Sequence, residues 1–158
     1  MNIQAALDQT ALIAGGALLR TGIYKGAGGI SGVKIAYSLP PENSTLVEEG
    51  PAHISFWDGV DVDPDGVRAG DLTVFRNLIR MQLCVAIGPS ELPKAISLLT
   101  PFVPLYIAAF GGKVSLNGTC ASCRIDSSAG IIESIYPDRI ALEFKLLATI
   151  KEAVPYAA

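Results

Sequence analysis

Apolar and polar residues alternate along two stretches of the chain, residues 75–87 and 139–151. A period of two is typical of a β-strand with one buried face. The apolar positions are Phe75, Ile79, Met81, Leu83, Val85 and Ile87 in the first stretch and Ile140, Leu142, Phe144, Leu146, Ala148 and Ile150 in the second. The polar positions between them include Arg76, Arg80, Gln82, Glu143, Lys145, Thr149 and Lys151. A slip of one residue would expose the whole apolar set, so the pattern predicts a well-defined register.

The segment between these two strands has a different hydrophobic period. Apolar residues recur there at spacings of three and four, which predicts one stripe along a helix. The stripe consists of Leu92, Ala95, Ile96, Leu99, Phe102, Val103, Tyr106, Ile107 and Phe110. Ser90 is a candidate cap and Pro93 falls in the first turn. Thr100-Pro101 and Pro104 predict either a kink or a second short helix that keeps the same phase. We expect the stripe to lie across the buried face of the sheet.

The first half of the chain is less periodic. Residues 2–24 predict a helix of small and aliphatic residues, weakened by Gly15 and Gly16. Lys25–Gly32 is too rich in glycine for regular structure and predicts a mobile loop. Short strands are expected at 33–38 and at 52–57.

Two further segments complete the prediction. Asp58–Asp71, with five aspartates and one arginine, predicts a long solvated loop. Residues 119–136 predict strand pieces around a bulge or loose turn at Ser127–Gly130. The expected fold is α+β, with one antiparallel sheet of four to five strands and with the N-terminal helix and the central helix pair on one face. Residues 1–158 are expected to form a single domain.

The composition of the chain restricts the classes of function that it can have. Half of the residues are apolar, 17% are charged and the formal net charge is −3. Such a surface predicts further burial against copies of the chain or a partner, and the charge argues against sequence-specific binding of nucleic acid. The apolar run 11–19 has no preceding Lys or Arg and is too short for a bilayer, so we expect synthesis in the cytoplasm and no membrane association. Three cysteines, an odd number, fit a reducing compartment.

Two loops invite ligand-binding interpretations. The glycines of Lys25–Gly32 do not match the dinucleotide-binding spacing, and Gly112-Lys113 lacks the earlier glycine of a P-loop. Asp61, Asp63, Asp65 and Gly66 match the first half of a calcium loop, but Leu72 stands where the bidentate glutamate belongs. We therefore predict no nucleotide, cofactor or metal site.

The cysteines and the single histidine offer no clear catalytic arrangement. Cys120 and Cys123 have C-x-x-C spacing, but the other zinc ligands available are Cys84 and His53, in two different expected strands. We expect buried, unreactive thiols. His53 is expected on the outer face of its short strand. No pair of carboxylates stands out as acid and base, so the chain is predicted to be structural and not an enzyme.

The order of elements supports a family resemblance. A helix-forming N-terminus, a long arginine-bearing strand, a helix and a C-terminal hairpin through Tyr136 and RIALEFKLLATIK resemble the tail terminator, or tail-to-head joining, proteins of tailed bacteriophages. The resemblance implies a virion protein that forms a homohexameric ring, caps the tail tube and joins the tail to the head connector. Its implied partners are the tail tube protein, a connector or neck protein, the sheath protein of a contractile tail, and double-stranded DNA that passes through without sequence preference.

Within this interpretation the two long loops are candidate channel or connector contacts. The residues concerned are Lys25, Gly28 and Gly32 in one loop and Asp58, Asp61, Asp63, Asp65 and Asp71 in the other. A basic lining would hold DNA, so a neutral or acidic one is expected. Another ring-forming neck, head-completion or tail tube protein is an alternative. A small-molecule binding domain or enzyme, with its ligand between helices and sheet, is an alternative of a different class.

Overall fold

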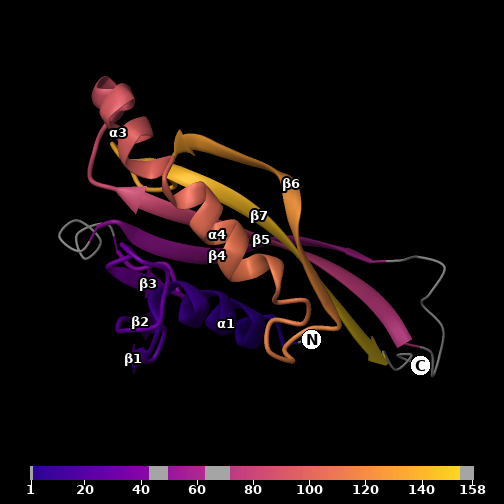
Figure 1. The fold of residues 1–158 in the computed structure, drawn as a ribbon. Helices are drawn as coiled ribbons and strands as arrows, with labels where there is room; N and C mark the ends of the chain where they lie inside the picture. Colours follow the sequence, from indigo (N-terminus) through magenta and orange to yellow (C-terminus); the bar gives the residue numbers. More distant parts are fainter. Residues whose placement is uncertain (1, 43–49, 63–71, 154–158) are drawn as a thin grey trace.

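One large sheet carries the helices on one of its faces (Figure 1). The computed structural model describes residues 2–42, 50–62 and 72–153. The described strands form a seven-stranded sheet in the order β1-β2-β3-β4-β5-β7-β6. The strands are β1 (Leu18–Arg20), β2 (Ile23–Tyr24), β3 (Ile35–Tyr37), β4 (Ala52–Val62), β5 (Leu72–Val85), β6 (Ser122–Glu133) and β7 (Ile140–Ala153). The helical elements are α1 (Ile3–Gly15), the 3-10 turn η2 (Pro89–Glu91), α3 (Leu92–Leu99) and α4 (Phe102–Gly111).

The two strands predicted from alternation are confirmed and lie side by side. β5 and β7 pair in antiparallel fashion from Leu72 opposite Ala153 to Val85 opposite Ile140. This register places the odd positions of β5 beside the even positions of β7 on one face, where they meet the helices in the main core. Core residues from these two strands are Ile79, Met81, Leu83, Val85, Ile140, Leu142, Phe144, Leu146 and Ala148. We call this the covered face and the opposite one the open face.

The helix stripe is confirmed in part, in its two-helix form. Leu92, Ile96 and Ile107, which were expected on the buried stripe, are exposed, because the buried face of the helices is narrower than the apolar pattern. α3 follows η2, and the axis bends by 56° between this first helical stretch and α4. The stripe keeps its phase across the bend, because Ala95, Leu99, Phe102, Tyr106 and Phe110 are all buried in the main core. Ser90 lies in η2, and no side-chain cap bond forms at the start of η2 or α3. Pro93 fits because it lies at the beginning of α3, where a missing N–H leaves no helical bond unmade.

The sheet is larger than the expected four to five strands, and it is mixed. β3 and β4 are parallel, whereas the other neighbouring strands are antiparallel. The two extra strands, β1 and β2, come from residues that were expected to continue the first helix. α1 ends instead at Gly15, and Gly16 has a φ of +100°, which glycine adopts without strain. A Cβ on Gly15 would lie 2.6 Å from the carbonyl oxygen of Tyr24, so glycine here permits the chain to fold back against the helix.

Two more segments differ from expectation or refine it. β4 continues to Val62, so the first residues of the expected acidic loop, Asp58 and Asp61 among them, belong to a strand. β6 runs from Ser122 to Glu133, and its register with β7 shifts between Ile125 and Ala129. That shift confirms the predicted irregularity around Ser127–Gly130.

A second, smaller core lies on the open face. Its buried members are Ile35, Tyr37, Ala52, Ile54, Cys84, Tyr136 and Ala141. The connection between β6 and β7 contributes Tyr136, whose hydroxyl donates a 2.6 Å hydrogen bond to the carbonyl of Pro41. The connection therefore folds over one end of the open face and shields it from water.

Candidate functional site

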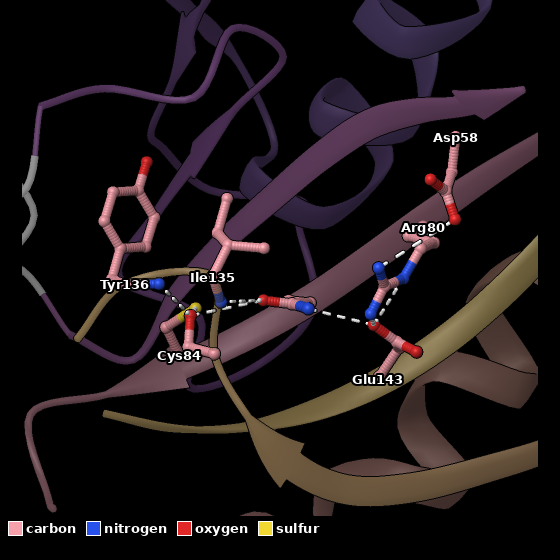
Figure 2. Close-up of polar contacts among 8 residues, drawn as sticks. Asp58, Arg80, Cys84, Ile135, Tyr136 and Glu143 are labelled. Atoms are coloured by element: carbon pink, nitrogen blue, oxygen red, sulfur yellow. Dashed lines mark hydrogen bonds and ion pairs between the residues drawn. The ribbon is translucent and has the colours of Figure 1, made fainter. Parts of the chain in front are cut away.

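The open face carries a cluster of polar side chains around Glu143, which is only 7% exposed (Figure 2). Strand β7 supplies Glu143, and β5 supplies Arg80 and Gln82. One carboxylate oxygen, Oε2, accepts from Arg80 Nε at 2.8 Å and from Gln82 Nε2 at 2.9 Å, and it also pairs with Arg80 Nη2. The antiparallel register explains the contacts, because Gln82 lies opposite Glu143 and Arg80 lies one side-chain position along the same face.

The cluster extends to the connection between β6 and β7. The side-chain oxygen of Gln82 accepts from the Ser134 hydroxyl at 3.2 Å and from the backbone N–H of Ile135 at 3.3 Å. Ser134 Oγ in turn accepts from the N–H of Tyr136 and lies 3.2 Å from the sulfur of Cys84. A continuous chain of hydrogen bonds therefore ties Glu143 to the connection that covers the smaller core (Figure 2).

This arrangement suits an anchor better than a catalytic base. The donors on Oε2 stabilise the charged carboxylate and leave that oxygen no free direction. Arg80 is held further by the ring of Phe56, 5.2 Å from the guanidinium carbon, and by Asp58, whose carboxylate oxygen lies 3.9 Å from Nη1. Each polar group thus has a partner that opposes its movement.

His53 lies elsewhere, and the expectation that it faces solvent is wrong. Its side chain is fully buried on the covered face, with Nδ1 2.7 Å from the Tyr106 hydroxyl and Nε2 2.7 Å from Ser55 Oγ. Ser55 Oγ lies 2.7 Å from Thr10 Oγ1, which is itself 2.7 Å from the carbonyl oxygen of Leu7. The sequence does not reveal the burial of His53, because the partner that makes this burial possible, Tyr106, is distant in the chain.

The partners determine the direction of each hydrogen bond in this chain. A carbonyl can only accept, so Thr10 donates to Leu7, and Ser55 therefore donates to Thr10. His53 then donates from Nε2 to Ser55 and accepts at Nδ1 from Tyr106, which requires a neutral ring. Burial lowers the pKa of His53 to about 3 and raises the pKa of Tyr106 well above its ordinary value. The chain is thus uncharged and links α1, β4 and α4.

The cysteines follow the expectation of weakly reactive thiols. Cys84 and Cys120 are buried, Cys123 is half-buried, and all three are free. Burial raises the pKa of Cys84 to about 11, and burial together with the neighbouring Cys120 raises the pKa of Cys123 to about 12. Within residues 2–42, 50–62 and 72–153, no three His, Cys, Asp or Glu side chains gather as metal ligands.

The glycine-rich loop lacks helix and strand, as predicted, but it is anchored. Ile30 is buried, and its N–H donates a 3.0 Å bond to the carbonyl of Ala14 at the end of α1. Lys25 N–H donates to Ala17, and a Cβ on Gly32 would lie 2.9 Å from the ring of Phe102. A Cβ on Gly28, by contrast, would meet no atom within 4 Å. The expectation of a mobile loop therefore has no support from these contacts.

The predicted aspartates divide between two settings. Asp58 lies on β4 beside Arg80, and Asp61 lies on the same strand opposite Arg76. Asp63, Asp65 and Asp71 lie outside the described residues. Asp58 and Asp61 lie in the second half of β4, whereas the glycine loop is hydrogen-bonded to the end of α1 and the residues that follow it.

Sequence reasoning missed Glu143, Arg80 and Gln82 as a unit. The alternation correctly places each of them on the polar face of its strand, but it does not indicate that they are buried or partly buried and bonded to one another there. The available signal was an acidic residue on one predicted strand and a basic and an amide residue on the other. Only the register of β5 against β7 shows that they meet.

The fold and these polar clusters define the chain as an α+β protein with a mixed sheet covered by helices on one face. Comparison with protein-family models and with curated proteins finds no match. No single helix in the described part of the chain is long and apolar enough to cross a membrane. The stretch Pro89–Leu99 and α4 reach that length and apolarity only together, across their bend.

Proposed function

We propose that this chain is a structural subunit that assembles head to tail into a closed ring, as the tail terminator proteins that it resembles do. In that role the ring would cap a phage tail tube and join it to the head connector, and DNA would pass through its centre. The observation that carries the proposal is the exposure of large apolar side chains on two separate parts of the surface.

The first of these parts is the helix pair α3 and α4. Its exposed apolar side chains are Leu92, Ile96, Leu98, Leu105 and Ile107. Ile107 is the most exposed of these five, at 52%. A helix that only covers a sheet would carry polar residues on its outer side. Apolar surface at this density favours a protein partner.

The second part lies at the β1 edge of the sheet, where Leu18, Leu19 and Leu39 are exposed. We call it the β1 edge surface, and the first part the helix-pair surface. α3 and α4 contact β7 and β6, at the other end of the strand order from β1. Two different surfaces at opposite ends of a subunit suit a heterologous contact, which closes into a ring when the rotation between neighbours allows it. The open hydrogen-bonding edges of β1 and β6 support the same arrangement.

The test uses one double variant on each surface, L105E/I107E on α4 and L18E/L19E on β1. We expect the wild-type chain to show the mass of a ring by light scattering and native mass spectrometry, and each double variant to be a monomer. When the two variants are mixed, each contributes one intact surface, so a heterodimer should form and growth should stop there. Electron microscopy of wild-type rings mixed with tail tubes would test the capping role.

The mixing experiment also shows how the proposal could fail. A two-fold symmetric contact through α4 would leave L18E/L19E fully assembled and would yield no heterodimer. A wild-type chain that stays monomeric at high concentration would contradict ring formation altogether. Circular dichroism of each variant checks that the fold is retained.

A further inference from the structure

The open face carries a second polar site, separate from the Glu143 cluster. Arg76, Thr149 and Ser122 lie in one row across β5, β7 and β6, since both Arg76 and Ser122 pair with Thr149. Arg124 lies two residues beyond Ser122 on the same face of β6, opposite Leu147. These residues line a pocket of about 190 Å³ together with Leu147 and Cys123. The two arginines therefore border one pocket from two strands that are not neighbours.

Positive charge dominates this pocket although the chain as a whole has a net charge of −3. Among the described residues, neither Arg76 nor Arg124 has a hydrogen-bonded or ion-paired carboxylate. Asp61 lies across from Arg76 on β4 but forms no ion pair with it. Lys151 adds a further cation two residues beyond Thr149 on the same strand face.

Cys123 does not offset this charge. Burial and the neighbouring Cys120 raise the pKa of its thiol to about 12, so the sulfur stays neutral at physiological pH. Cys123 also lies opposite Ala148 and packs against the main core, so its thiol faces the covered side of the sheet. The pocket thus combines two guanidinium groups and two hydroxyls.

We propose that this pocket binds one tetrahedral oxyanion of the phosphate class. Each guanidinium offers two parallel N–H donors that match two oxygens of a phosphate group. The hydroxyls of Ser122 and Thr149 can donate to the remaining oxygens. A carboxylate has only two oxygens and cannot use all four groups, so the donor set favours a tetrahedral anion. This inference concerns the open face and does not depend on ring formation.

The test is a calorimetric titration of the full chain with inorganic phosphate at constant ionic strength, with acetate titrated in parallel. We expect saturable binding of one phosphate per chain and at least tenfold weaker binding of acetate. The variant R76Q/R124Q should weaken phosphate binding at least tenfold. The variant R20Q/K34Q removes the same charge elsewhere and should bind phosphate like the wild type.

A short DNA duplex, added as competitor, identifies the source of the phosphate group. Displacement of phosphate by the duplex indicates a nucleic-acid backbone, whereas unchanged phosphate binding indicates a small phosphorylated ligand; both outcomes support the site. Heats that do not saturate, or equal losses in the two double variants, would overturn it. Duplex binding without any phosphate binding would also overturn it, because it would reflect diffuse surface charge.

Discussion

The two faces of the sheet hold different kinds of polar residue. On the covered face the buried polar groups of His53, Ser55, Thr10 and Tyr106 are neutral and satisfy one another in a single chain. On the open face Arg80 and Glu143 remain charged, and Arg80 keeps contact with water, its side chain being 25% exposed. Burying an unpaired charge is far more expensive than burying a hydrogen-bonded neutral group. The helix layer therefore determines which kind of polar group each face can hold.

The two faces therefore contribute to different properties of the protein: the covered face to its stability and the open face to its interactions with other molecules. The covered face contains most of the apolar core, and its polar chain fastens α1 and α4 to β4. The open face keeps charged groups near the surface, where a ligand or partner can reach them. We therefore expect substitutions on the covered face to change the free energy of unfolding most, and those on the open face to change binding.

The largest contrast should come from the same truncation on each face. Phe144 is buried on the covered face, with its ring centroid 4.9 Å from that of Tyr106. Phe144→Ala should lower the free energy of unfolding by about 3–5 kcal/mol because it leaves a cavity that helices and sheet cannot close. Phe56→Ala on the open face, where the ring is only half-buried, should cost less than about half as much. Urea unfolding of both variants measures the contrast, and equal losses would contradict it.

The neutral chain on the covered face provides the second test. Tyr106→Phe removes the donor to His53 Nδ1 and leaves a buried acceptor without a partner. The expected loss is about 1–3 kcal/mol in the free energy of unfolding. Tyr136→Phe is the matched control, since it removes one hydroxyl bond, to Pro41, at a position closer to the surface. Its loss should be smaller because water can take the place of the hydroxyl.

Acid provides a third test of the covered face. The pKa of His53 is about 3 in the folded chain and close to its ordinary value of 6.5 in the unfolded chain. Between these values only the unfolded chain takes up the proton, so stability is complete above pH 6.5 and falls as the pH drops toward 3. The slope from this group is about 1.4 kcal/mol per pH unit. Denaturation at pH 7.5, 6.5 and 5.5 should show the loss below 6.5.

A variant without the imidazole gives the control for this pH dependence. His53→Gln keeps a polar side chain but cannot take up a proton in this range. The loss between pH 6.5 and 5.5 should therefore shrink in His53→Gln, even if that variant is less stable at every pH. An unchanged slope would assign the dependence to other groups.

The sequence was most informative where one period extended over many residues. The alternating positions of β5 and β7 and the stripe through Leu99 and Tyr106 identified the covered face and its helices, because burial of a whole face leaves a regular pattern. β1 and β2 were missed because Leu18–Tyr24 is apolar enough for either helix or strand. The close approach of Gly15 to Tyr24 decided between them.

Polar sites were harder to predict because they depend on pairs that are distant in sequence. His53 and Tyr106 are separated by 53 residues, and Gln82 and Glu143 by 61. Local patterns show which face a residue takes but not what it meets there. The register of one strand against another supplies that information, and a single sequence contains no direct record of it.

The smallest expected effect tests the charged pair of the open face. A double-mutant cycle of Arg80→Gln and Glu143→Gln should give a coupling of about 1 kcal/mol, because the arginine remains in contact with water. The coupling should decrease between 0.05 and 0.5 M salt, since screening weakens an exposed pair. The coupling of Tyr106→Phe with Ser55→Ala, measured in the same way, should not change with salt, because that chain carries no charge. If both couplings respond equally to salt, the distinction between a neutral covered face and a charged open face does not hold.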